Sequence, residues 1–113
     1  MAISHDGIGQ VCVTLYCDDS ITQGIPCCLS ADNHVTACAY EDEFCGIVVN
    51  AKNSLANVII QGIVTVPYSG ETPNIGFDYL AGDGQGKVAV VSDAPKYTIF
   101  SVDTVNKTVT FLL

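Results

Sequence analysis

The sequence predicts an all-β protein: a single antiparallel β-sandwich or small β-barrel that spans residues 1–113. First, runs of alternating or β-branched apolar residues recur along the chain, while the spacing typical of amphipathic helices is nearly absent. Second, clusters of Asp, Asn and Gly separate these runs at short intervals. Third, 49% of the residues are hydrophobic and only 14% are charged, which is enough apolar material for a well-filled core.

Seven runs carry the strand pattern, through a period of two and a high content of Val, Ile, Thr and aromatic residues. In chain order they are residues 11–16, 34–39, 46–50, 57–66, 87–91, 97–103 and 107–113. Turn-forming residues lie between them, at 18–20, 31–33, 69–70, 82–86, 93–95 and 105–107. We expect at most one short helix, at residues 51–55.

The chain also resembles itself at a spacing of 51 to 53 residues. The first match is between two hairpins: Leu29-Ser-Ala-Asp32 with His34-Val35, and Leu80-Ala-Gly-Asp83 with Lys87-Val88. Two later matches join residues 44–50 to 97–103 and residues 58–60 to 109–111. Two related halves of about 52 residues, joined by residues 66–73, would close one common core, because a half of that size cannot bury its own apolar face. Identities are few, so a chance likeness between two runs of β-hairpins is the alternative.

The net charge of −8 argues against several classes of partner. The four basic residues are all Lys, and a chain without Arg and with 12 acidic residues is a poor ligand for nucleic acid or for an anionic membrane surface. Residues 1–50 hold seven acidic residues and no Lys, whereas residues 51–113 hold five acidic residues and four Lys. An electrostatic partner would therefore meet the first half.

The first residues lack the basic and apolar regions of a signal peptide, so we expect no export signal. No apolar run approaches the roughly 20 residues that span a bilayer. The sequence therefore predicts no membrane partner.

Six cysteines lie in the first half, at positions 12, 17, 27, 28, 38 and 45. Because packing alone must hold the second half, we expect the first half to need no disulfides and its cysteines to be reduced, buried thiols. Zinc is the alternative, since Cys12 and Cys17 approach the spacing of structural ligands and His34 precedes Cys38 by four residues. On a strand, that last spacing separates two side chains by about 13 Å. We therefore expect no metal site.

The segment Gly82-Asp-Gly-Gln-Gly-Lys-Val88 comes closest to a chemical motif. A phosphate-binding loop would need glycine in place of Ala81, a hydroxyl residue in place of Val88 and a following helix, so a hairpin turn is expected instead. A nucleophile formed by His34 with Cys38 or Cys45 lacks a third, orienting group at a recognisable spacing. We expect no catalytic residue, no cofactor and no enzymatic activity.

An ordered series of segments occupies residues 24–113. It consists of Gly24-Ile-Pro-Cys-Cys-Leu, the strand Phe44-Cys-Gly-Ile-Val-Val, the long strand from Ala56 to Pro67, Gly76-Phe-Asp-Tyr-Leu, a Gly-rich turn and the closing Val102-Asp with Lys107-Thr-Val-Thr-Phe-Leu-Leu. This order resembles the capsid decoration, or head cement, proteins of tailed bacteriophages and prophages. The cysteines and the acidic first half depart from the family's pattern.

The resemblance implies a non-enzymatic structural protein of the virion, made in the bacterial cytoplasm, that binds and stabilises the outer surface of the assembled head. Its partner would be the major capsid protein, and it would act as a homo-oligomer. We expect residues 1–10 to form an arm that orders on docking, with Ile3 and Ile8 as capsid contacts. The apolar segment 108–113 should be a paired strand or an intersubunit contact.

Two other functions are open. One is a carbohydrate- or peptide-binding β-module of a phage fibre or tail accessory protein, which an exposed cluster of Tyr16, Tyr40, Tyr68 and Tyr79 on one face would favour. The other is a small cysteine- or zinc-containing protein.

Overall fold

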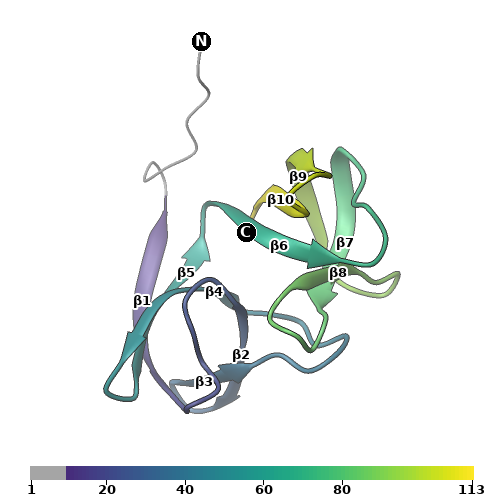
Figure 1. Cartoon of the computed structure of the whole chain (residues 1–113). Coiled ribbons are helices and arrows are strands. Elements are labelled where there is room, and N and C mark those ends of the chain that lie inside the picture. The colour runs from purple at the N-terminus through teal and green to yellow at the C-terminus, as the bar shows by residue number, and fades with distance from the viewer. Residues whose placement is uncertain (1–9) are drawn as a thin grey trace.

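In the computed structural model, which describes residues 10–113, the chain forms ten β-strands, and no helix occurs in this range (Figure 1). The all-β prediction is confirmed. The strands are β1 (Val11–Cys17), β2 (Pro26–Ala31), β3 (His34–Ala37), β4 (Gly46–Lys52), β5 (Leu55–Gln61), β6 (Ile63–Ser69), β7 (Gly76–Gly82), β8 (Val88–Val90), β9 (Lys96–Asp103) and β10 (Thr108–Leu112).

The strands close into two small barrels, which lie side by side in Figure 1. The first has the order β1-β3-β2-β4-β5 and the second β10-β6-β8-β7-β9. In each barrel the first strand runs parallel to the third and antiparallel to the fifth, and the other neighbours are antiparallel. Adding five to each strand number converts the pairings of the first barrel into those of the second. The two related halves are therefore confirmed.

The residue register also repeats. Leu15 pairs with Ala56 in the first barrel as Val66 pairs with Val109 in the second. Strands β4 and β9 each contain a bulge at the corresponding position, where Val49 and Phe100 are skipped in the pairing. A shared bulge supports a common backbone plan for the halves, since a bulge bends its strand and closes the barrel at a defined place.

Part of the sequence alignment of the halves is wrong by two residues. Val35 and Val88 do correspond, but Leu80 corresponds to Cys27, because the exposed Leu29 faces outward on β2. Phe44 and Tyr97, which the alignment equated, instead stack on each other. A shift of two leaves a period-two pattern unchanged. The alignment placed two extra residues in the second turn, whereas the structure pairs Leu29 with Val35 and Gly82 with Val88 at the same separation along the chain.

Each barrel has its own core, so the expectation of one common core is wrong. Closing a sheet into a barrel turns the apolar face of that half inward, and no open face is left to share. The core of the first barrel contains Cys17, Ile21, Cys27, Val35, Val48, Ala56 and Val58. The core of the second contains Val64, Val66, Tyr68, Leu80, Val88, Ile99, Val109 and Phe111, together with Cys38, Phe44 and Ile47 from the first half.

The barrels join at Gly62, within the run 57–66 that the sequence predicts as one strand. Gly62 has φ +124°, in the region that favours glycine, and a Cβ at this position would lie 3.0 Å from Cα of Gln10. The Leu113 amide donates a hydrogen bond to the Gly62 carbonyl over 2.8 Å. The junction is thus this residue, and the linker predicted at 66–73 lies in β6 and the loop after it.

Three further local predictions can be compared with the structure. The short helix predicted at 51–55 is wrong, because Lys52 pairs with Leu55 across a two-residue hairpin turn at Asn53 and Ser54, both with positive φ. Strands β2 and β7 are absent from the seven predicted runs, since their Pro, Cys and Gly content weakens the strand pattern. The expected pairing of the C-terminal segment is confirmed, because β10 lies between β6 and β9.

A buried hydroxyl in the second barrel offers a stability test. Tyr68 is 1% exposed, and its hydroxyl has no hydrogen-bond partner within the described range 10–113. Burying an unpaired hydroxyl costs about 1–3 kcal/mol. We therefore expect Tyr68→Phe to keep the fold and to raise the free energy of unfolding by about 1 kcal/mol in urea denaturation. If Tyr68→Phe lowered the free energy of unfolding by about 1 kcal/mol, the Tyr68 hydroxyl would have a hydrogen-bond partner, contrary to the structure.

Candidate functional site

The second barrel carries an exposed apolar surface on β7, β9 and β10. We call it the apolar face, and it consists of Ile75, Phe77, Tyr79, Phe100 and Leu112. Phe77 and Leu112 both pair with Thr98, so the two side chains point to the same side of the sheet. Phe77 is 50% exposed and Leu112 is 42% exposed. Because the barrel core lies on the opposite side of these strands, a partner is needed to remove the apolar face from water.

Two aromatic rings and a lysine form the centre of this surface. The rings of Phe77 and Tyr79 meet edge to face with their centroids 6.2 Å apart, and Lys96 Nζ lies 4.1 Å from the centroid of Phe77. The lysine therefore makes a cation–π contact with the ring. Such a surface can pack against apolar protein side chains or stack on a flat ligand.

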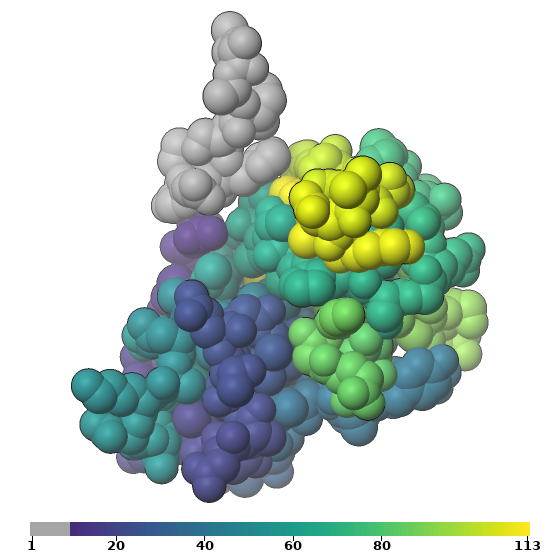
Figure 2. Space-filling view, in the orientation of Figure 1, coloured from purple at the N-terminus to yellow at the C-terminus, as the bar shows by residue number. Residues whose placement is uncertain are grey.

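A second distinctive region is the segment 38–45 between β3 and β4, which we call the crossing loop. It leaves the first barrel and lies against the second, below β8 in Figures 1 and 2. The Glu41 amide donates to the Gly82 carbonyl, and the Gly82 amide donates to the Asp42 carbonyl, both over 2.9 Å. Tyr40 forms a β-bridge with Asp83. The loop therefore fixes the first barrel to the second.

Phe44 anchors the crossing loop by its side chain. It is 6% exposed and stacks on Tyr97 with the centroids 5.3 Å apart, and Phe111 lies 6.0 Å away. The acidic residues of the same loop, Glu41 to Glu43, are exposed. The acidic side chains of the loop therefore face water, and its aromatic ring lies in the core of the second barrel.

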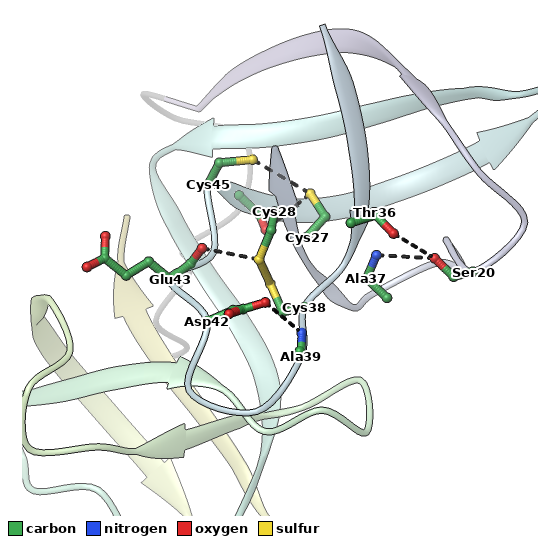
Figure 3. Close-up of a disulfide and its surroundings, with 11 residues drawn as sticks. Ser20, Cys27, Cys28, Thr36, Ala37, Cys38, Ala39, Asp42, Glu43 and Cys45 are labelled. Atoms are coloured by element: carbon green, nitrogen blue, oxygen red, sulfur yellow. Dashed lines mark hydrogen bonds between the residues drawn. A yellow bond between two sulfur atoms is a disulfide. The ribbon is translucent and has the colours of Figure 1, made fainter. Parts of the chain in front are cut away.

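Cysteines stand at both ends of the crossing loop, opposite the two consecutive cysteines of β2 (Figure 3). Cys38 forms a disulfide with Cys28, with their Cα atoms 5.4 Å apart. Sγ of Cys28 also lies 3.2 Å from the carbonyl oxygen of Glu43. At the other end, Sγ of Cys45 lies 4.0 Å from Sγ of Cys27, and the Cys45 amide donates to the Cys27 carbonyl over 2.8 Å.

The prediction of six reduced, buried thiols is thus wrong for four of them. Cys28 and Cys38 form the disulfide, Cys12 is exposed on β1 and Cys45 is partly exposed. The reason is the strand geometry of β2, where successive side chains point to opposite faces. Cys27 enters the core of the first barrel, whereas Cys28 faces the crossing loop and the second core.

The two thiols of the Cys27–Cys45 pair differ in acidity. Cys27 is fully buried, and its hydrogen bond to Cys45, together with its burial, raises the pKa of its thiol. The same hydrogen bond lowers the pKa of Cys45 to about 7. Once Cys45 is deprotonated, the remaining proton of the pair stays on Cys27, because two adjacent thiolates would repel each other.

This acidity predicts the pH dependence of alkylation at Cys45. Because the thiolate reacts, the rate with iodoacetamide should rise with pH and reach half its maximum near the pKa of about 7. Cys27→Ala removes the donor, so the pKa should return toward 9.0. At pH 7, this change should slow Cys45 at least about tenfold. Exposed Cys12 serves as the internal reference in the same mass-spectrometric assay, and equal slowing at both sites would contradict the assignment.

The Gly-rich segment after β7 is a turn, as the sequence predicts. The Asp83 amide donates to the Lys87 carbonyl over 2.9 Å. The Asp83 carboxylate accepts hydrogen bonds from the Ser69 hydroxyl at 2.6 Å and from the amides of Gln85 and Lys87 at 2.7 and 3.0 Å. Burial raises the pKa of Asp83, but these hydrogen bonds lower it more. The Asp83 carboxylate is therefore fully engaged in hydrogen bonds to the turn and to Ser69.

Two hollows border the first barrel. A pocket of about 170 Å³ at the end of β1 is lined by Cys17, Asp18, Asp19, Ile21, Lys52 and Asn53 among others. Hydrogen bonds from Ser20 and Thr36 lower the pKa of Asp18, and burial raises the pKa of Cys17. A groove of about 300 Å³ between the barrels is lined by residues that include Gln10, Gln23, Ile47, Ile59, Ile63 and Thr65.

The residues proposed for binding have different positions. Ile3 and Ile8 lie outside the described residues. Tyr68 is buried, while Tyr16, Tyr40 and Tyr79 are exposed on β1, on the crossing loop and on β7, which are three separate elements. The partner of Tyr79 is Phe77, which the sequence prediction missed. The alternation Gly76-Phe-Asp-Tyr could have indicated it, since a strand places residues 77 and 79 on one face.

The residues of the zinc alternative are dispersed over the first barrel and the crossing loop. Cys12 is exposed, Cys17 is in a core and Cys38 is in the disulfide. Between residues 10 and 113, no group of three or more His, Cys, Asp or Glu side chains is placed to hold a metal ion. The same part of the chain contains no helix with the length and hydrophobicity needed to cross a membrane.

No protein-family model and no curated protein matches the chain. The likeness to decoration proteins therefore depends on the order of segments in residues 24–113.

Proposed function

We propose that the protein is a non-enzymatic structural protein of a phage or prophage virion that binds and stabilises the outer surface of the capsid. The apolar face carries the proposal. It combines aromatic and aliphatic side chains on one side of a sheet, and covering such a surface with a protein partner is favourable. The resemblance of residues 24–113 to decoration proteins supports the choice of the major capsid protein as that partner.

The barrel architecture supports docking by side chains. Closed barrels pair their strands internally, so a partner does not add a strand to an open edge and instead meets an outer face. The chain would dock as a homo-oligomer through the apolar face of the second barrel. Its acidic first half would face water and oppose nonspecific contact between particles.

The test requires heads assembled from the major capsid gene that neighbours this gene. Purified full-length protein is mixed with these heads and the particles are sedimented. We expect the protein to sediment with them, and Phe77→Ser combined with Tyr79→Ser to weaken binding at least about tenfold, because these side chains lie at the centre of the contact.

Leu29→Ser is the matched control, since Leu29 is 60% exposed on the first barrel, away from the apolar face. It should bind as the unmodified protein does. Absence of capsid, portal and protease genes nearby would argue against the proposal. So would equal binding of the double variant and the control.

One observation favours a second candidate, a carbohydrate- or peptide-binding β-module of a phage fibre or tail. The edge-to-face rings of Phe77 and Tyr79 beside Lys96 suit stacking on a sugar ring or an apolar peptide side chain. This candidate predicts that an oligosaccharide or peptide array gives binding that the Phe77→Ser change abolishes. It also predicts that the protein does not sediment with heads.

A further inference from the structure

Two pairs of cysteines frame the crossing loop, and one of them is already a disulfide. Cys38 at the start of the loop is bonded to Cys28, and Cys45 at its end lies beside Cys27. Cys27 and Cys28 are consecutive residues of β2. One strand therefore offers both ends of the loop a sulfur atom (Figure 3).

The backbone around the second pair is already fixed in a suitable arrangement. Cys27 pairs with Gly46 in the register of β2 and β4, and the Cys45 amide donates to the Cys27 carbonyl over 2.8 Å. The two sulfur atoms lie 4.0 Å apart, whereas a disulfide has a sulfur–sulfur distance of about 2.05 Å. The remaining approach of about 2 Å is within the range of rotations of the two side chains.

The two thiols also differ in access. Cys45 is partly exposed, whereas Cys27 is 0% exposed and buried among core residues of the first barrel. A soluble reagent therefore meets Cys45 first. The buried partner is then in position to complete the reaction.

We propose that Cys27 and Cys45 form an oxidisable pair, which a small-molecule disulfide such as oxidised glutathione converts into a second disulfide that closes the crossing loop at its other end.

The exchange takes two steps. The Cys45 thiolate attacks one sulfur of oxidised glutathione, a bond forms between Cys45 and that sulfur, and the glutathione disulfide bond breaks to release one glutathione thiolate. Cys27 then loses its proton and attacks the Cys45 sulfur, which releases the second glutathione as a thiolate. The two protein thiols are oxidised, and one glutathione disulfide is reduced to two glutathione molecules.

The second disulfide would change how firmly the barrels are connected. The crossing loop carries Phe44 into the second core, donates a backbone hydrogen bond from Glu41 to Gly82 and accepts one from the Gly82 amide at Asp42. A loop bonded to β2 at both ends has less conformational freedom in the unfolded chain. The folded state, which contains these contacts, is therefore stabilised. The oxidised protein should therefore unfold at a higher urea concentration than the protein with one disulfide.

The test uses the full chain with the Cys28–Cys38 disulfide intact and oxidised glutathione as the probe. We expect the intact mass to fall by about 2 Da, without retained glutathione. Cleavage after the acidic residues Asp19, Asp32, Glu41 and Glu43 puts Cys27 with Cys28, Cys38, and Cys45 on three separate peptides, and it leaves Cys12 and Cys17 on a fourth peptide that should stay unlinked. Without reduction, the oxidised protein should yield one species in which the peptide of Cys27 and Cys28 is bonded to those of Cys38 and Cys45.

Variants assign the bonds. Cys27→Ser should stop at the mixed disulfide and retain glutathione on Cys45, whereas Cys45→Ser should lose the 2 Da change. Cys12→Ser and Cys17→Ser should react as the unmodified protein does. The inference fails if glutathione stays on Cys45 in the unmodified protein, if the three-peptide species does not form, or if Cys12 or Cys17 supplies the second sulfur.

Discussion

Phe44→Ala will lower the free energy of unfolding by about 3–5 kcal/mol, since it deletes a buried aromatic ring and leaves a cavity. Phe44 is 6% exposed and belongs to the crossing loop, yet its ring stacks on Tyr97 and contacts Phe111 in the second core. The substitution therefore removes an aromatic side-chain link between the barrels. Urea denaturation followed by circular dichroism measures the loss.

Phe77→Ala is the matched control for this prediction. The same ring is removed, but Phe77 is 50% exposed on the apolar face, so the loss should stay near or below about 1 kcal/mol. Equal losses in the free energy of unfolding for the two variants would show that the Phe44 ring contributes no more to stability than an exposed ring does. The connection between the barrels would then depend on the backbone hydrogen bonds of Gly82 and on Cys38 and Ile47 in the second core.

Gly82→Ala will destabilise the protein by about 3 kcal/mol because of overpacking against the crossing loop. A Cβ on Gly82 would lie 2.5 Å from Cβ of Cys38 and 3.3 Å from the carbonyl oxygen of Ala39. Cys38 is bonded to Cys28, so it cannot easily move away. Separation of the two segments would also break the backbone hydrogen bonds that Gly82 makes with Glu41 and Asp42.

Gly70→Ala separates this clash from the general cost of replacing glycine. Gly70 has φ +74° and no atom within 4 Å of an added Cβ, so only backbone strain of about 1 kcal/mol is expected. Thermal or urea unfolding compares the two variants. If Gly82→Ala costs no more than Gly70→Ala, the close approach between β7 and the crossing loop is incorrect.

The sequence pattern predicts the strands well where apolar side chains alternate. Runs such as Val64, Val66 and Tyr68 on β6 point inward in the structure as the alternation requires. The internal repeat was also visible, because both halves follow the same order of strands and turns. A pattern with a period of two does not fix the exact alignment of the two halves. The sequence therefore matches Leu29 with Leu80, whereas in the structure Cys27 corresponds to Leu80.

Long-range contacts set the features that the sequence could not predict. The glycine at position 62 divides one apolar run into two strands because the barrels meet there, which no local pattern reveals. Cys28 and Cys38 become partners only because β2 and β3 pair and the crossing loop starts beside them. The apolar face depends in the same way on three strands, β7, β9 and β10, whose pairing brings Phe77 and Leu112 to one side.

The measurement that tests capsid decoration most directly is the amount of this chain in native particles. The phage or prophage particles are purified by density gradient, and the chain and the major capsid protein are quantified by mass spectrometry in each fraction. Decoration predicts a fixed ratio of the two proteins across the particle peak, near whole-number copies per capsid subunit cluster. Particles that contain the major capsid protein without this chain, while the chain remains at the top of the gradient, would contradict it.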